Sequence, residues 1–351
     1  MRKHTLDVSK KQARALFMHA TQGRGKVVIV YHGDADGTAS AALAAAAVER
    51  LGGAPVCRTP AKGENIHAPA FARLVEACRP ELVSVFDTGS RPERPFGDLP
   101  TIIVDHHRID TEPPVEAFVS TFGDDDSVST SALTLDLLAP IAALEDRAWL
   151  AAVGLLGDLG DAARHDPVVT RAAAAHGITR LRTVVSLVNA AGRSAAHEVD
   201  VALDALRAAE TPAAIVRGEG PAAARLHALR AEVADALARS RKVAPKVEGR
   251  WAVIELDEPF RVHGVIAGAW TGRLSDSIVL VANRGYSPGR VHFAVRSHAP
   301  LDLRAALLRL VPDAGPDFAA GHDRATGGIV DVATYDRLRR AIREAASSRA
   351  A

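Results

Sequence analysis

The fold of this chain is constrained most by three short runs of β-branched and other apolar residues, each of which leads directly into a polar turn. The runs are KVVIVYH (26–32), ELVSVFD (81–87) and TIIVD (101–105). Their length and continuous apolar character are typical of strands buried on both faces of a sheet. An alanine-rich segment of helical character, TASAALAAAAVERLGG (38–53), follows the first run. Because strands that alternate with helices form parallel sheets, the sequence predicts an α/β fold built on a mainly parallel sheet.

Four turns that follow apolar segments hold most of the acidic and histidine residues suited to chemistry. In open sheets, functional groups gather beyond the carboxyl ends of the strands, so we expect these turns at one edge. Each turn alone is also explained by an aspartate that caps a helix and a glycine with positive φ. Their combination in one chain predicts a metal centre. The turns are His32-Gly-Asp34-Ala-Asp36-Gly37, Phe86-Asp87-Thr88-Gly89, Asp105-His106-His107 and Gly157-Asp158-Leu-Gly-Asp161.

The charges in these turns indicate which cofactor they would hold. Several carboxylates at one edge would repel one another and take up protons unless cations neutralise them. A pair of divalent metal ions does so and also polarises phosphate. Oxygen and imidazole ligands together suit Mn²⁺, with Mg²⁺, Co²⁺ and Fe²⁺ as alternatives. The turns contain no cysteine, which argues against a structural zinc site.

The second half of the chain predicts a helical connector and a smaller α/β domain. Residues 195–242 are strongly helical, with apolar residues at helical spacing from Leu226 to Leu237. The segment 244–250 is expected to form a turn, after which WAVIEL, SIVLVAN and RVHFAVRS are strand candidates around a helix near 262–274. We expect an N-terminal helix at 1–24, a catalytic domain at 25–194, the connector at 195–245 and a substrate-binding domain at 246–351.

Charge and composition limit the partners and the compartment. The chain has 43 Lys and Arg against 42 Asp and Glu, so its overall charge favours neither nucleic acid nor a membrane, and any polyanion site must be local. Two cysteines, Cys57 and Cys78, are too few for a disulfide framework and indicate a reducing compartment. No signal peptide or membrane span is recognisable. We therefore expect a cytoplasmic protein with no membrane partner, and its oligomeric state stays open.

Four motifs resemble those of the DHH phosphoesterase superfamily and occur in the same order: YHGDADGTAS, FDTG, VDHH and GLLGDLGD. In the second domain, AVRS (294–297) and GHDRATGG (321–328) are similar to the substrate-binding signatures of the DHH-associated C-terminal domain. LVNAAGR (187–193) resembles a segment of RecJ-type exonucleases. The resemblance implies kinship with RecJ-like nucleases, with nanoRNA and cyclic-dinucleotide phosphodiesterases as more compact relatives.

The resemblance implies that two metal ions share five ligands: Asp34, Asp36, Asp87, His106 and Asp158. Asp87 would bridge the two ions. His107 would contact the scissile phosphate, and Asp105 would accept the N–H of a neighbouring imidazole and so fix its tautomer. His32 precedes the first ligand by two residues rather than the four of some relatives. It therefore either ligates a metal with altered geometry or only flanks the site.

The resemblance also implies a substrate-binding set: Arg296, Ser297, Gly321, His322, Asn189 and Arg193. Arg296 would grip a neighbouring phosphate or base with its forked donors, and the Gly321-His322 turn would do so with backbone N–H groups, across the cleft between the domains. A surface cation on a strand is the alternative for Arg296. A structural role between the domains is the alternative for Asn189 and Arg193.

The implied activity is two-metal hydrolysis of phosphodiester bonds in short single-stranded DNA or RNA, or in linear dinucleotides. Hydrolysis of cyclic dinucleotides or of nucleotide phosphomonoesters is a second interpretation, and a catalytically inactive nucleic-acid-binding scaffold is a third. The ligand set reads as intact, which favours an enzyme over the scaffold. The chain has no aromatic-rich basic stretch that would serve as a stacking platform, which argues against processive action on long strands.

Overall fold

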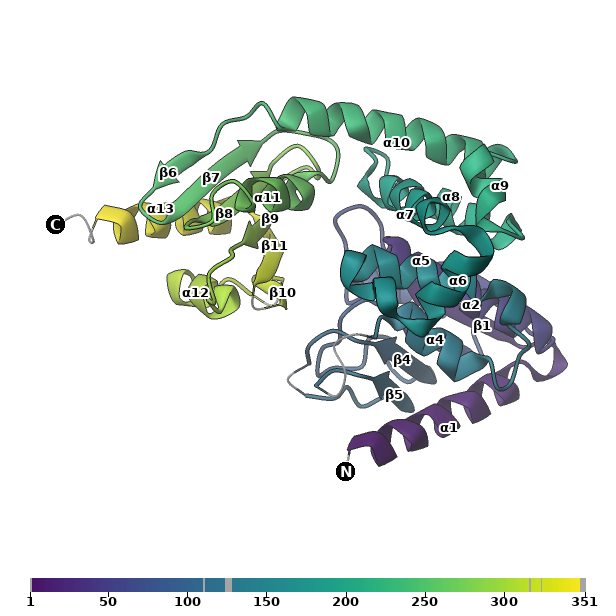
Figure 1. The fold of residues 1–351 in the computed structure, drawn as a ribbon. Helices are drawn as coiled ribbons and strands as arrows, with labels where there is room; N and C mark the ends of the chain where they lie inside the picture. The colour runs from purple at the N-terminus through teal and green to yellow at the C-terminus, as the bar shows by residue number, and fades with distance from the viewer. Residues whose placement is uncertain (1, 110, 124–127, 316, 323, 348–351) are drawn as a thin grey trace. The chain divides into compact units, whose positions relative to one another are not determined.

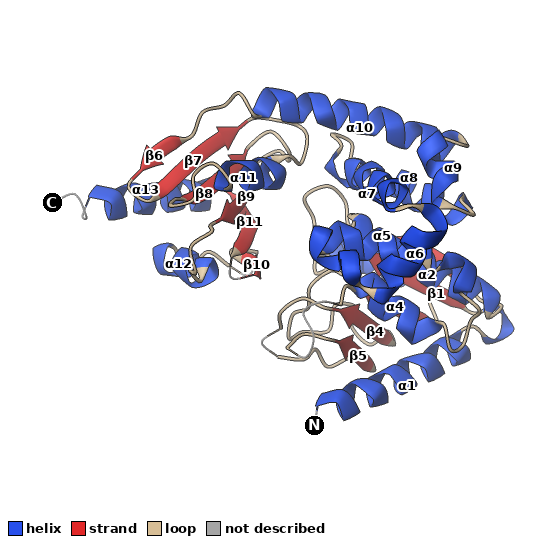
Figure 2. Cartoon of the chain, in the orientation of Figure 1, coloured by secondary structure: helices blue, strands red, loops and turns tan. Residues whose placement is uncertain are grey.

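The computed structural model describes residues 2–109, 111–123, 128–315, 317–322 and 324–347, which form two compact units. Residues 1–192 and 197–230 make up the first unit, and residues 193–196 and 231–351 make up the second. Figure 1 labels the helices and strands, and Figure 2 separates them by colour. Within the described part of the chain, no helix combines the length and apolar character needed to cross a membrane.

The first unit is built on a five-stranded, all-parallel sheet with the strand order β2-β1-β3-β4-β5. The central strands β1, β3 and β4 are buried except at Lys26, as their continuous apolar sequences predict. The mainly parallel sheet expected from the sequence is therefore confirmed. The strands are β1 (Lys26–Tyr31), β2 (Ala54–Arg58), β3 (Leu82–Phe86), β4 (Thr101–Asp105) and β5 (Ala117–Ser120).

The sequence does not predict the two edge strands of this sheet. β2 is only half-buried and contains Pro55, which has no N–H for a ladder hydrogen bond and is tolerated at an edge. β5 is only four residues long, and buried residues alternate along it with partly exposed ones. Strands this short and this mixed lack the continuous apolar run that marks the buried central strands.

Helices cover both faces of the first sheet. On one face, Phe71 and Val75 of α3 pack with Val28, Val30 and Val83 in one apolar cluster. On the other face α2 packs on β1, as a right-handed crossover requires, and contacts α4, α5 and α8. The helices of this unit are α1 (Arg2–Ala20), α2 (Ala35–Arg50), α3 (Pro69–Ala77), α4 (Thr130–Leu138), α5 (Trp149–Asp158), α6 (Pro167–His176) and α7 (Ile178–Arg193), with 3₁₀ turns at Gln22–Arg24, Glu145–Arg147 and Gly160–His165.

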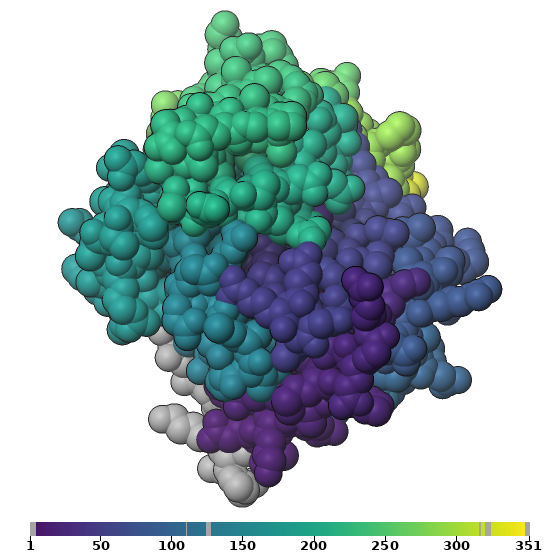
Figure 3. Space-filling view, turned by 90° about the vertical axis from the view of Figure 1, so that its right-hand side faces the viewer, coloured from purple at the N-terminus to yellow at the C-terminus, as the bar shows by residue number. Residues whose placement is uncertain are grey.

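The two segments that the sequence predicts as an N-terminal helix and a helical connector are helical in the structure. α1 contacts β5 and buries Ala13 and Phe17, and the purple N-terminal part of the chain lies on the surface of the first unit (Figure 3). The expected connector contains α8 (Val199–Ala208), α9 (Pro212–Arg217) and α10 (Pro221–Ser240). The division between the two units falls inside α10.

The second unit contains a six-stranded sheet with the order β10-β11-β9-β8-β7-β6, in which only β7 and β8 pair in parallel. α11 packs on one face of this sheet, and α12 and α13 pack on the other. The three expected strands and the helix near 262–274 are confirmed. The elements are β6 (Lys246–Glu248), β7 (Trp251–Leu256), α11 (His263–Thr271), β8 (Ile278–Asn283), β9 (Arg290–Arg296), α12 (Leu303–Leu310), β10 (Ala320–His322), β11 (Ala325–Asp331) and α13 (Val332–Ser347).

The segment 244–250 is not the plain turn that its sequence predicts. Lys246–Glu248 forms β6, an exposed edge strand that pairs antiparallel with β7. The chain reverses at Gly249, whose φ of 58° suits glycine. Similarly, the glycine-punctuated segment 321–328 lies in the antiparallel pair β10 and β11. Both segments carry polar or glycine residues in place of alternating apolar ones, so their sequences do not predict strands.

The structure predicts a strong dependence of the second unit on Arg339 of α13. This buried side chain makes two hydrogen bonds of 2.7 and 2.9 Å to the Glu248 carboxylate, which fastens the edge strand to the helix. Arg339→Met leaves the Glu248 carboxylate with only the weaker ion pair to Lys246 at 3.8 Å, and should lower the free energy of unfolding by about 2–3 kcal/mol. Arg337→Met on the same helix breaks only an exposed pair with Asp313 and should change nothing measurable. Urea unfolding of both variants tests this, and equal losses would contradict it.

Candidate metal centre

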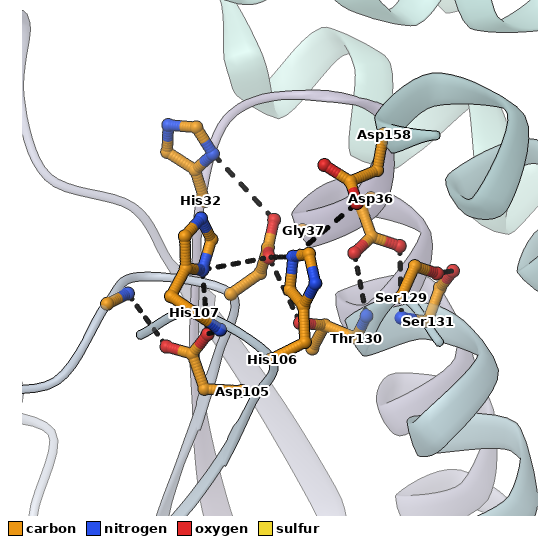
Figure 4. Close-up of polar contacts among 12 residues, drawn as sticks. His32, Asp36, Gly37, Asp105, His106, His107, Ser129, Thr130, Ser131 and Asp158 are labelled. Atoms are coloured by element: carbon orange, nitrogen blue, oxygen red, sulfur yellow. Dashed lines mark hydrogen bonds and ion pairs between the residues drawn. The ribbon is translucent and has the colours of Figure 1, made fainter. Parts of the chain in front are cut away.

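The candidate centre lies at the carboxyl edge of the parallel sheet. The last residues of β1 and β3 are opposite each other, and β4 continues the same register. His32, Asp87 and the Asp105-His106-His107 segment therefore emerge side by side, because each ends or follows one of these strands. Asp158 is the last residue of α5 and lies in the same group (Figure 4).

A first group of possible ligands consists of His32, Asp34 and Asp87, with one nitrogen or oxygen atom of each within 4.8 Å of the others. His32 Nδ1 lies 3.0 Å from Asp34 Oδ2 and 3.8 Å from Asp87 Oδ2. Asp34 also caps α2, because its Oδ1 accepts the N–H groups of Asp36 and Gly37. The Asp34 carboxylate thus holds the turn with one oxygen and presents the other beside His32.

Asp87 belongs to a second group as well, together with His106 and His107. Its Oδ1 lies 3.5 Å from His106 Nε2 and 3.7 Å from His107 Nδ1. Asp158 Oδ2 lies 3.6 Å from the same His106 nitrogen. The backbone of Asp87 has a positive φ of 62°, a conformation that costs energy in a non-glycine residue and is typical of functional sites. Asp87 thus directs its two oxygens toward two different sets of ligand atoms.

These atoms fit divalent metal ions. The separations around His106 exceed a normal hydrogen bond, and its Nε2 is buried without a hydrogen-bond partner among the described residues. An ion with bonds of about 2.0–2.2 Å holds neighbouring ligand atoms about 3 Å apart. Small movements of the side chains would bring Asp87, His106 and Asp158 to that spacing. The mixture of carboxylates and imidazoles is the donor set that suits Mn²⁺.

The electrostatics of the centre indicate a deficit of positive charge. Burial raises the pKa of Asp36, and the neighbouring Asp87 carboxylate raises it further, to about 7. Burial also raises the pKa of Asp158. For His106, burial lowers the pKa, but the contact with Asp87 outweighs this effect and raises it to about 9. Protons bound to these side chains therefore offset negative charge that metal cations would otherwise neutralise.

Asp36 is nearly inaccessible and turns its carboxylate toward the start of α4. Its Oδ2 accepts the backbone N–H of Thr130 at 2.8 Å, and its Oδ1 accepts that of Ser131 at 3.0 Å. Asp36 is in neither group of possible ligands described above, although the charges of Asp34, Asp87 and Asp158 all act on it. Its expected role as a ligand stays a prediction.

Asp105 contacts His107 rather than His106. Its Oδ1 lies 2.7 Å from His107 Nδ1, and its Oδ2 accepts the backbone N–H of Gly89 at 2.7 Å. Burial favours a higher pKa for Asp105, but the charge and hydrogen bonds of His107 outweigh it and lower the pKa. In turn, burial lowers the pKa of His107, but Asp105 outweighs this and raises it to about 10. The pair holds the imidazole in a fixed orientation.

Asn189 and Arg193, two of the residues expected to bind substrate, lie on α7. The Asn189 side chain contacts the turn that carries Asp34. Asn189 Oδ1 accepts the backbone N–H of Ala35 at 3.0 Å, so this side chain supports the turn from within the first unit. A Cβ atom on Gly192 would lie 2.1 Å from the Gly33 carbonyl oxygen, so only glycine allows this approach. Arg193 ends α7, and its carbonyl accepts the N–H of Arg261, a residue of the same second unit.

The other expected substrate residues lie in the second unit. Arg296 ends β9, and its Nη1 donates to the carbonyls of Val295 and Thr326. Burial lowers the pKa of this guanidinium. Ser297 is buried, and its Oγ accepts the Ala299 N–H. Gly321 and His322 lie in β10, but their side-chain environment is outside the described part of the structure, so the contact expected of them stays a prediction.

Sequence reasoning does not identify the role of the Ser129-Thr130-Ser131 segment. Plain N-capping of α4 is the expectation from these residue types, yet the Ser129 side chain makes no capping bond. Thr130 instead donates its hydroxyl to Asp87 Oδ1 at 3.0 Å. Three adjacent hydroxyl residues that are all fully buried are unusual at a helix start, and only the structure reveals this burial.

Comparison with known proteins finds a family match for part of the chain and a shared fold for most of it. Residues 26–155 match the family described as DHH family, N-terminal domain. No curated protein matches the chain. A crystal structure of exonuclease RecJ bound to manganese has a TM-score of 0.69 at 21% identity, over 97% of this chain and 94% of that one. RecJ in complex with Mn²⁺ from Thermus thermophilus has a TM-score of 0.70 at 21% identity, over 97% of this chain and 55% of that one.

A third structure, the DHH domain of a member of a family of ribosomal proteins, has a TM-score of 0.70 at 14% identity, over 97% of this chain and 91% of that one. At these identities the likeness shows a shared fold. The family match covers the strands and turns that supply all the candidate ligands except Asp158. Residues 26–155 thus match the N-terminal domain of the DHH family, and the chain shares its fold with the RecJ structures.

Proposed function

We propose that this chain is a metal-dependent phosphoesterase of the DHH superfamily, and more specifically a two-metal phosphodiesterase that hydrolyses short single-stranded nucleic acid or linear dinucleotides. The observation that carries the proposal is the position of Asp87, whose two oxygens face different sets of ligand atoms. A pair of divalent ions would supply the charge that polarises a phosphate and lowers the pKa of a nearby water molecule. The nucleic-acid substrate is supported by the likeness of fold to the exonuclease RecJ.

The ligands divide into two sets around Asp87. His32, Asp34 and Asp87 would hold one ion, and the other would take its ligands from the second set: Asp36, Asp87, His106 and Asp158. Asp36 remains able to ligate, because each carboxylate oxygen has two lone pairs and the start of α4 uses one on each. Mn²⁺ is the favoured ion because imidazoles take part, with Mg²⁺ or Co²⁺ as alternatives.

His107 is suited to contact the phosphate. Asp105 holds its Nδ1, so a contact with substrate would come through Nε2. The His107 side chain is about one-third exposed, whereas His106 is buried. With a pKa of about 10 in the metal-free protein, the imidazole carries a proton at neutral pH and would donate it as a hydrogen bond to a phosphate oxygen.

The second unit offers a row of residues for the rest of the substrate. Arg296 is opposite Ala325 of β11, and Ala325 is opposite His322 of β10, so the two motif segments meet across three neighbouring strands. Arg296 is held by two backbone carbonyls, and a guanidinium fixed in this way can bind a phosphate with its remaining donors. The binding contribution would be local, because the chain has a net charge of only +1.

Activity should require a divalent ion, and binding of that ion should strengthen as pH rises. His106 has a raised pKa of about 9 without metal, so an ion must displace its proton at neutral pH. The affinity for Mn²⁺ should therefore rise about tenfold per pH unit for each proton displaced, and level off above pH 9. Calorimetric titration of the metal-free protein between about pH 6.5 and 9.5 measures this. A flat profile, or full activity in excess EDTA, would contradict the metal centre.

Asp87→Ala should weaken both metal sites, because it removes the carboxylate that they share. The fold should largely persist. The metal content of the dialysed variant, measured by elemental analysis, should fall from two ions to fewer than one per chain. Asp161→Ala is the matched control, since this exposed aspartate of the same motif as Asp158 forms an ion pair with Arg182, away from the candidate ligands. Two ions retained in the Asp87 variant would assign the bridge to the wrong residue.

Short substrates should be preferred, and Arg296 should hold them. Arg296→Ala should raise KM on a five-nucleotide oligomer by about tenfold or more, because a charged contact contributes about 1.5–3 kcal/mol. Metal content should not change. Arg290→Ala, at the exposed start of the same strand, should leave KM unaltered. Degradation of a long single strand with a kcat/KM well above that of the oligomer would argue against this substrate class.

A further inference from the structure

The start of α4 contacts two of the candidate ligand carboxylates through a single residue. The backbone N–H of Thr130 donates to Asp36 Oδ2 at 2.8 Å, and the Thr130 hydroxyl donates to Asp87 Oδ1 at 3.0 Å (Figure 4). Thr130 is fully buried, so water cannot take over either contact. No other described residue makes hydrogen bonds of this kind to both carboxylates.

These contacts do not belong to ordinary capping. The first turn of a helix leaves N–H groups without partners inside the helix, and a local side chain usually accepts from them. In α4 the acceptor is instead Asp36, 94 positions away in the sequence. The hydroxyl of Ser131 donates to the Ala151 carbonyl at 3.2 Å, which ties the same turn to α5. Hydrogen bonds therefore tie the start of α4 to the two carboxylates and also to α5.

The hydroxyl of Thr130 fixes how the Asp87 carboxylate is rotated. Asp87 Oδ1 accepts this hydrogen bond and lies beside His106, while Oδ2 lies beside His32. A carboxylate that is shared between two ions must present one oxygen to each side. Free rotation of the Asp87 carboxylate would move Oδ1 away from His106 and Oδ2 away from His32.

We propose that Thr130 is a positioning residue of the metal centre, whose hydroxyl sets the rotation of the shared Asp87 carboxylate. The inference rests on the proposed two-metal site. It adds a residue that binds neither metal nor substrate and acts through Asp87. Groups that orient a metal ligand in this way typically contribute about 10- to 100-fold to metal affinity.

The packing of α5 supports this role. A Cβ atom on Gly154 would lie 2.0 Å from Ser131 Oγ and 2.4 Å from Asp36 Oδ1. Helix α5 thus closes against the α4 turn with no spare space, so the turn cannot shift to compensate for a lost hydrogen bond. The same helix ends at Asp158, another of the candidate ligands.

A purely structural role is the competing explanation, and Thr134 allows the two to be separated. Thr134 lies one turn further along α4, is equally buried, and donates its hydroxyl to the Thr130 carbonyl at 2.8 Å. Among the described residues, its hydroxyl contacts no carboxylate. Thr130→Val and Thr134→Val therefore make the same chemical change at the same depth, and only the first removes a contact to Asp87.

The experiment titrates Mn²⁺ into the metal-free protein, as the whole chain, by calorimetry and follows the bound ion by electron paramagnetic resonance. Thr130→Val should weaken at least one of the two sites by about tenfold or more and alter the spectrum of the bound pair. Thr130→Ser keeps the hydroxyl and should restore both to nearly wild-type values. Thr134→Val should bind as wild type. Melting temperatures in EDTA should fall similarly in both valine variants, since each loses one buried hydrogen bond.

The outcomes separate this inference from the proposed function. Two Mn²⁺ ions bound with wild-type affinity by Thr130→Val would overturn the role of Thr130 and leave the metal site standing. An equal loss in Thr134→Val, or no rescue by Thr130→Ser, would also overturn it. Failure of the wild-type protein to bind Mn²⁺ would remove both proposals. If Thr130→Val does not fold, the smaller Thr130→Ala carries the same test.

Discussion

Three carboxylates at one edge of the sheet, those of Asp36, Asp87 and Asp105, are almost completely buried, and the surrounding structure compensates for the cost of burying them. A buried charge without partners costs several kcal/mol. The partners differ in kind: the neighbouring His107 and the Gly89 N–H serve Asp105, and the start of α4 serves Asp36. Further aspartates add negative charge nearby. That remaining negative charge is the reason to propose this edge as a site for cations rather than as a set of helix caps.

The parallel sheet brings the carboxylates together, and helices hold them at fixed positions. Strand register alone puts His32 and Asp87 at neighbouring strand ends. α7 then supports the turn after β1 through the hydrogen bond from Ala35 to Asn189 and through the close approach of Gly192. The turn with the candidate ligand Asp34 is thus held by a strand, by its own helix and by a third element. This preorganisation is what a metal centre requires of its scaffold.

Particular residues show what could be predicted from the sequence. The central strands were predictable because a strand buried on both faces must be continuously apolar, and so was the meeting of His32, Asp87 and His106 at one edge, because these residues follow those strands. β2, β5 and β6 were not, since edge strands such as the one with Pro55 need no such pattern. The hydrogen bond from Thr130 to Asp87 could not be predicted from the sequence either. It joins residues 43 apart in sequence that meet only after α4 packs on the sheet.

The two units use strand direction differently, and this difference bears on the proposed recognition of substrate. A parallel sheet gathers strand ends that are far apart in sequence, so the ligand turns extend from His32 to Asp158. An antiparallel sheet can pair strands that lie close together in the sequence, so Arg296, Ala325 and His322 fall into one row within a short stretch of chain. Under the proposed function, changes in that short stretch would alter substrate binding without moving any candidate ligand of the metal centre. The candidate ligands therefore depend on long-range packing in the first unit, whereas the residues proposed to bind substrate depend on local sequence in the second.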